Sequence, residues 1–203
     1  MITNIITYSS VVIDHLYLQF YNHHNIGIAC LYADYKDQTN QTVVNILGSI
    51  LRQLLTTVSI PIPDEVIQKL DKTRHEGKKV EIDDILALLR IRLHQLKCAF
   101  ICIDAIDELE PKVRQKLLNI LKELVTSNNV HLFLTGRGHV ESEVQKLFKI
   151  KQGYTVNISA SPQDIREFVR HQIKEDCDLN PEAMDTVLAK GIEDAIVEKS
   201  EGM

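Results

Sequence analysis

Short apolar runs alternate along the chain with segments in which apolar residues recur every three or four positions. The runs predict β-strands at residues 27–33, 98–104, 130–135 and 154–158. The second and third runs are almost continuously apolar, which is typical of strands that are covered on both faces. Strands that alternate with helices favour a parallel sheet with helices packed against it. We therefore predict an α/β fold with a parallel sheet flanked by helices.

The segments between these runs predict helices. Apolar residues fall at helical spacing over residues 43–58 and 85–96. A third helical pattern follows Pro111, a residue type that suits the first position of a helix.

Beyond residue 160 the pattern becomes helical only. Ser161 and Asp164 have the spacing of a capping box, which marks the start of a helix. We predict an α/β domain over residues 1–160 and the start of a helical subdomain over residues 161–203.

Composition narrows the class of protein. The 203 residues are 44% hydrophobic and 25% charged, as in soluble globular proteins. A net charge of −5, only 5% aromatic residues and no tryptophan disfavour a nucleic-acid partner. No apolar run reaches the roughly 18 residues that a membrane-spanning helix needs, and the first residues lack the pattern of a secretory signal. The four cysteines include no CxxC pair, so we expect a reduced, cytoplasmic chain.

Carboxylates follow directly after the second predicted strand. Asp104 ends the apolar run, and Asp107 and Glu108 come next. Ligands of open parallel sheets bind beyond the carboxyl ends of the strands, where a carboxylate can hold Mg²⁺ and a second acid can orient or deprotonate water. The segment has the form of a Walker B motif, with Asp104 as metal ligand and Asp107 or Glu108 as base. Alternatively, it is an acidic loop that favours the N-terminus of the next helix.

A hydroxyl and a cation follow the third predicted strand. Thr135 and Arg137 flank Gly136 at the end of an apolar run. An arginine in this position can bind the phosphates of a nucleotide. Alternatively, Arg137 is an exposed side chain after a tight turn.

The sequence contains no phosphate-binding loop of the form GxxxxGK[ST]. Among its eight glycines only Gly77 precedes a lysine. Lys79 then stands where the motif requires Ser or Thr, and Lys72 stands at its first glycine.

The chain as a whole resembles the NACHT modules of fungal STAND-type NTPases, including the nephrocystin-like N-terminal domain. The resemblance implies a P-loop NTPase-like fold that binds Mg²⁺ with ATP or GTP. It implies Asp104 as the metal ligand, Asp107 and Glu108 as catalytic residues, and Thr135 and Arg137 as nucleotide-binding residues. The similar segments are residues 9–16 (the helix after the P-loop), 29–38, 41–54, 102–109 (Walker B) and 135–140 (the sensor segment, in which proline is usual at Gly138).

One part of the family pattern is missing. The P-loop strand should precede Ser9, yet residues 1–8 contain neither glycine nor lysine. In the family this strand lies between the sensor strand and the last strand, here 130–135 and 154–158. Its loss leaves a gap in the sheet unless residues 1–6 or a rearrangement fill it. We therefore expect a partial NACHT domain, from a fragment, a gene-model error or a degenerate copy.

Two functions follow from this resemblance. The first is a nucleotide-dependent signalling switch, which the complete family forms. The second is a non-catalytic scaffold that binds other protein domains or a further copy of itself. Backbone N–H groups and the P-loop lysine supply most of the hold on the β- and γ-phosphates. We therefore expect these 203 residues to bind nucleotide weakly or not at all, and not to hydrolyse it.

Overall fold

The computed structural model describes most of the chain. The described residues are 2–20, 22–56, 61–62, 64, 66–68, 71, 80–127, 129–149, 155–156, 158, 161–179 and 185–200, with side chains from Ser9 to Lys199 within them. They fall into two compact units, Ile2–Lys151 and Gln152–Met203.

The first unit is built on a parallel sheet. Strands β1 (Ile26–Tyr32), β2 (Cys98–Asp104) and β3 (Val130–Leu134) pair in the order β1-β2-β3, so β2 is central. Each strand matches its predicted bounds to within one residue. The α/β prediction is therefore confirmed.

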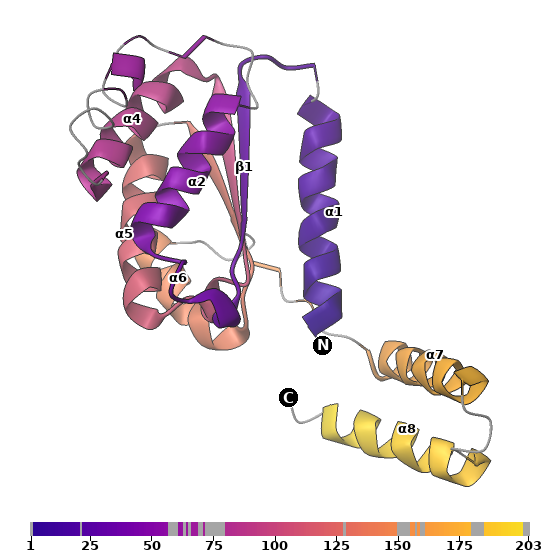
Figure 1. Ribbon diagram of the computed structural model, residues 1–203. Helices are drawn as coiled ribbons and strands as arrows, with labels where there is room; N and C mark the ends of the chain where they lie inside the picture. The colour runs from indigo at the N-terminus through magenta and orange to yellow at the C-terminus, as the bar shows by residue number, and fades with distance from the viewer. Residues whose placement is uncertain are drawn as a thin grey trace. The chain divides into compact units, whose positions relative to one another are not determined.

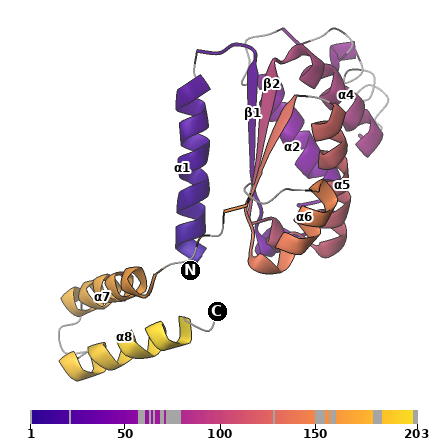
Figure 2. The ribbon, with the colours of Figure 1, turned by 180° about the vertical axis from the view of Figure 1, so that it is seen from behind.

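Helices cover both faces of this sheet. Helices α2 (Val43–Thr56), α4 (Ile82–Gln95) and α5 (Pro111–Ser127) lie against one face, and α1 (Ile2–Phe20) lies against the other (Figure 1). The view from behind shows the same layers (Figure 2). The first unit also contains α6 (Glu141–Phe148) and three short 3-10 helices: η1 (Tyr35–Asp37), η2 (Ile106–Glu108) and η3 (Gly138–Val140).

Side chains of β2 alternate between the two faces of the sheet and contribute to the packing on both. Successive strand side chains point to opposite faces. Ile101 and Ile103 are fully buried in the main core, with leucines of α2, α4 and α5. Phe100 lies on the opposite face and stacks on Phe20 of α1, with ring centroids 5.1 Å apart. The continuous apolar run of β2 is thus explained by burial on both sides.

Two segments differ from the sequence expectations. Residues 2–6, considered above as a replacement strand, belong to α1. In the predicted fourth strand, the described residues Thr155, Val156 and Ile158 have no regular structure, and Val156 is 79% exposed; Tyr154 and Asn157 lie outside the described residues. The predicted strand is therefore wrong at these three positions. An apolar run does not form a strand without a neighbour to accept and donate its backbone hydrogen bonds.

A side-chain amide covers the outer edge of β1. The backbone N–H of Cys30 donates to Oε1 of Gln53 at 2.9 Å, and Nε2 of Gln53 donates to the Cys30 carbonyl at 2.8 Å. Gln53 on α2 thus makes the two hydrogen bonds that a further strand would make at this position. A covered edge is a protection against pairing with other chains.

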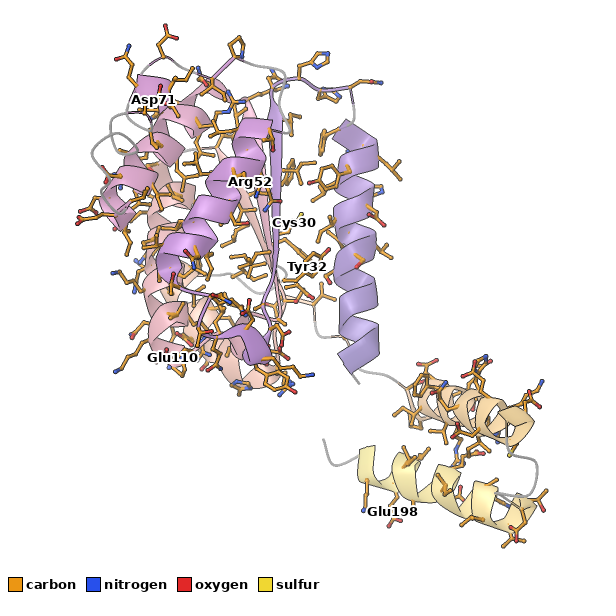
Figure 3. All side chains as sticks on the ribbon, in the orientation of Figure 1. Cys30, Tyr32, Arg52, Asp71, Glu110 and Glu198 are labelled. Atoms are coloured by element: carbon orange, nitrogen blue, oxygen red, sulfur yellow. The ribbon has the colours of Figure 1, made fainter. Side chains whose placement is uncertain are left out.

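Replacing Gln53 with leucine is expected to lower the free energy of unfolding by about 2 kcal/mol, because it leaves two partly buried backbone groups of Cys30 without these partners. Urea denaturation followed by circular dichroism measures this change. Arg52→Leu, at the neighbouring exposed position of α2 (Figure 3), is the control and should change stability by less than about 0.5 kcal/mol. Equal effects of the two substitutions would contradict the role given to Gln53.

The second unit contains helices α7 (Pro162–Leu179) and α8 (Thr186–Ser200). The predicted capping box is present: the Asp164 N–H donates to Ser161 Oγ at 3.1 Å, and the Ser161 N–H donates to Asp164 Oδ2 at 2.9 Å. Arg170 and Arg166 donate to the Glu193 carboxylate across the helix pair at 2.9 Å, and these hydrogen bonds lower the pKa of Glu193. Among the described helices of the chain, none is both long and apolar enough to span a membrane.

Candidate functional site

The candidate residues lie where β2 and β3 end. Backbone hydrogen bonds connect the residues just after β1 and β3 to the end of β2. The Ala33 N–H donates to the Asp104 carbonyl, and the Thr135 N–H donates to the Ile103 carbonyl, each at 3.0 Å. Because the strands are parallel, the residues that follow β1, β2 and β3 meet at one edge of the sheet. The five residues singled out from the sequence are on this edge.

Asp104 and Thr135 form a hydrogen-bonded pair, termed the buried pair because the Asp104 carboxylate is buried, whereas Thr135 is partly exposed. The Thr135 hydroxyl donates a hydrogen bond to Asp104 Oδ1, and Asp104 is only 3% exposed. The same hydroxyl accepts the N–H of Ala105 at 2.9 Å. Ala105 has a left-handed backbone conformation with φ of 54°, which is unfavourable for a residue with a side chain. Thr135 therefore holds both the carboxylate and the sharp turn that follows it.

Asp107, Glu108 and Arg137 form a second group. The Arg137 N–H donates to Asp107 Oδ1 at 3.2 Å, and Arg137 Nε lies 3.4 Å from Asp107 Oδ2. Arg137 Nη2 lies 3.7 Å from Glu108 Oε1. The Asp107 side chain is 4% exposed, whereas that of Arg137 is 59% exposed. The arginine thus lies over the two acids on the solvent side, and its single positive charge offsets part of their negative charge.

Gly136 allows the loop after β3 to approach this group closely. A Cβ atom at this position would lie 3.0 Å from Val140 Cγ2, 3.2 Å from Ile106 Cγ2 and 3.3 Å from Asp107 Oδ1. These distances are shorter than ordinary van der Waals contacts. A side chain between Thr135 and Arg137 would therefore require Val140, Ile106 or Asp107 to shift by a few tenths of an ångström.

An open cleft of about 450 Å³ adjoins the second group. Its lining contains Asp107, Glu108 and Arg137 but not Asp104 or Thr135. The structure therefore divides the five candidate residues into a buried pair and a group that faces the cleft. The other lining residues are Tyr35, Gln38, Leu109, Pro111, Arg114 and His139.

Comparison with known proteins places the chain in a family. The model of the family described as nephrocystin 3, N-terminal, matches residues 6–137, about two thirds of the chain. The chain belongs to this family. All five candidate residues lie inside the matched range, and Arg137 is its last residue. No curated protein and no solved structure matches the chain.

The described side chains at this site of the nephrocystin 3 N-terminal domain do not form a metal site from protein ligands alone. In the described part of the chain, no three His, Cys, Asp or Glu side chains gather closely enough to hold a metal. Mg²⁺ needs an octahedral shell of oxygen atoms and usually keeps several waters. Asp104 is 3% exposed and accepts the Thr135 hydroxyl through one carboxylate oxygen, so a magnesium ion beside it would need further oxygen ligands from water or phosphate.

Sequence reasoning missed several residues at this edge of the nephrocystin 3 N-terminal domain. The Tyr35 N–H donates to Glu108 Oε2 at 3.1 Å and so links the ends of β1 and β2. Arg114 pairs with Glu143 at 3.1 Å and thereby joins α5 to α6 beside the cleft. The polar turn after β1 was a signal for Tyr35. Arg114 follows the ordinary polar pattern of a helix surface, and no signal in the sequence distinguishes it.

Proposed function

We propose that the chain forms the Walker B side of a NACHT-type, nucleotide-dependent signalling switch, and that these 203 residues by themselves bind MgATP or MgGTP only weakly. Membership of the nephrocystin 3 N-terminal family and the acids at the carboxyl edge of the sheet support the first part. The absence of GxxxxGK[ST] from the sequence supports the second.

The observation that carries the proposal is the pairing of Arg137 with Asp107 and Glu108. Both acids already have hydrogen-bond donors, in Arg137 and in the Tyr35 N–H. A triphosphate that recruits Arg137 competes with Asp107 and Glu108 for its guanidinium group. Because the Arg137 side chain is 59% exposed, its ion pairs contribute little to stability, and the guanidinium group can exchange between acid and phosphate. This exchange is a physical basis for switching, but without a phosphate-binding loop few other contacts would hold the phosphates.

A second candidate function is that of a non-catalytic scaffold, which binds other protein domains or a further copy of the chain. The buried pair of Asp104 and Thr135 favours it, because the carboxylate accepts a hydrogen bond inside the protein and so links the loops after β2 and β3. In this role the acids need no ligand.

Calorimetric titration of the 203-residue protein with MgATP and with MgGTP separates these possibilities. We expect heats that do not saturate at micromolar nucleotide. A micromolar dissociation constant that Asp104→Ala abolishes would overturn the proposal of weak binding.

Because Asp104 is buried, the Asp104→Ala protein could lose binding through misfolding. A second pair of variants avoids this problem. Arg137→Ala alters an exposed side chain of the site, and Arg90→Ala alters an exposed arginine on α4 as the matched control. Binding that is lost in Arg137→Ala but kept in Arg90→Ala assigns the nucleotide to this edge. No binding at millimolar nucleotide in any of these proteins favours the scaffold.

A further inference from the structure

Two cysteines lie side by side between the sheet and α1. Cys30 of β1 and Cys102 of β2 are partners in the parallel register, so their side chains project from the same face. Figure 3 shows Cys30 on the side of β1 that faces α1. Neighbouring strands lie about 4.8 Å apart, which is within the Cα separation of about 4.4–6.8 Å that a disulfide spans. All four cysteines of the chain are free thiols in this structure.

The two thiols are in direct contact. The Cys102 thiol donates a hydrogen bond to the Cys30 sulfur, and the Tyr17 hydroxyl of α1 also bonds to Cys30. These bonds lower the pKa of Cys30, the one from Cys102 having the largest effect, although burial opposes them. The same contact, together with burial, raises the pKa of Cys102, and burial chiefly raises that of Tyr17 to about 12. Cys30 is therefore the member of the pair that ionises first.

The cysteine that ionises first is also the more exposed of the two. Cys102 is 1% exposed, whereas Cys30 is half-buried. The thiol that ionises first therefore belongs to the more exposed residue of the pair, and the thiolate is the form that reacts with oxidants. Cys98 is on the same strand as Cys102 but four residues earlier, about 13 Å along the strand, and so cannot replace it as the partner of Cys30.

We propose that Cys30 and Cys102 form a redox-active thiol pair that a hydroperoxide oxidises to an intramolecular disulfide beneath α1. The Cys30 thiolate attacks the peroxide and the O–O bond breaks, so that Cys30 becomes a sulfenic acid. The leaving oxygen takes up the proton that the Cys30 thiol lost and departs as an alcohol or water. The Cys102 sulfur then attacks the Cys30 sulfur and displaces the hydroxyl group, which leaves as water with the Cys102 proton. Two electrons pass from the sulfurs to the peroxide.

The test uses the folded 203-residue protein with Cys98→Ser and Cys177→Ser, which leaves only the pair. After treatment with hydrogen peroxide, free thiols are alkylated and the digested peptides are analysed by mass spectrometry. We expect both alkylatable thiols to be lost, a cross-linked Cys30–Cys102 peptide to form, and dithiothreitol to restore both thiols. The unsubstituted protein should lose two of its four thiols.

Adding Cys102→Ser to this variant is the matched control, and it should leave Cys30 oxidised without an intramolecular cross-link. Circular dichroism before oxidation confirms that each protein is folded. The proposal is overturned if both thiols remain alkylatable, if the cross-link joins different chains, if Cys30 passes to the sulfinic acid without a cross-link, or if the cross-link forms only in urea.

Discussion

Replacing Arg92 with alanine is expected to lower the free energy of unfolding by about 3 kcal/mol. Arg92 is charged yet fully buried, at 0% exposure. Its Nε donates to the Leu54 carbonyl near the end of α2 at 3.0 Å, and its Nη1 donates to Gln95 Oε1 at 3.0 Å and to the Pro61 carbonyl at 3.4 Å. Truncation removes these donors and leaves a cavity where the aliphatic stem packs. Urea denaturation of both proteins measures the difference.

Arg90→Ala is the matched control for this substitution. Arg90 lies two residues earlier on α4, its side chain is 48% exposed, and its pair with Glu123 is 3.4 Å long. An exposed ion pair of this kind contributes little, so we expect a loss below about 0.5 kcal/mol. A loss of less than about 1 kcal/mol for Arg92→Ala would show that water replaces its hydrogen bonds, and the role given to it as a link between α2 and α4 would be wrong.

Much of the fold could be predicted because the core imposes a strong pattern. The bounds of β2 are those expected, Cys98–Asp104, since burial on both faces makes the strand continuously apolar up to its terminal carboxylate. The start of α5 at Pro111 followed from the fixed φ of proline. Arg92 shows the limit of this reasoning. In a helical pattern an arginine predicts a solvent-exposed position, and only the course of α2 and Pro61 in space gives it buried partners.

The position of the candidate site at one edge of the sheet could be predicted from the sequence. The separation of its five residues into the buried pair and the group that faces the cleft could not. A parallel sheet places the residues after β2 and β3 at the same edge. The division arises at Ala105, where a left-handed turn separates the buried Asp104 from Asp107 and Glu108 in the cleft. Alanine rarely adopts this conformation, so the sequence carries no signal for the turn. The ion pair of Arg137 with Asp107 likewise depends on how closely Gly136 lets two loops approach.

Replacing Thr135 with valine is expected to lower the free energy of unfolding by about 3 kcal/mol. Valine has nearly the same shape but no hydroxyl. It removes the donor to the buried Asp104 carboxylate and the acceptor of the Ala105 N–H in the left-handed turn. A buried carboxylate and a backbone N–H that both lose a partner carry the full cost of desolvation. Urea denaturation followed by circular dichroism provides the measurement.

Thr135→Ser tests whether the hydroxyl is the cause. Serine keeps both hydrogen bonds and loses one methyl group, so we expect a loss below about 1 kcal/mol. If valine and serine are equally well tolerated, the hydroxyl does not hold Asp104 in the folded protein, and the buried pair would no longer favour the scaffold. If valine alone is destabilising, Asp104 and Thr135 have a structural role that persists without any nucleotide. In that case Asp104→Ala could abolish nucleotide binding by disturbing the structure. Only the comparison with Arg137→Ala would then show whether a contact with the nucleotide is lost.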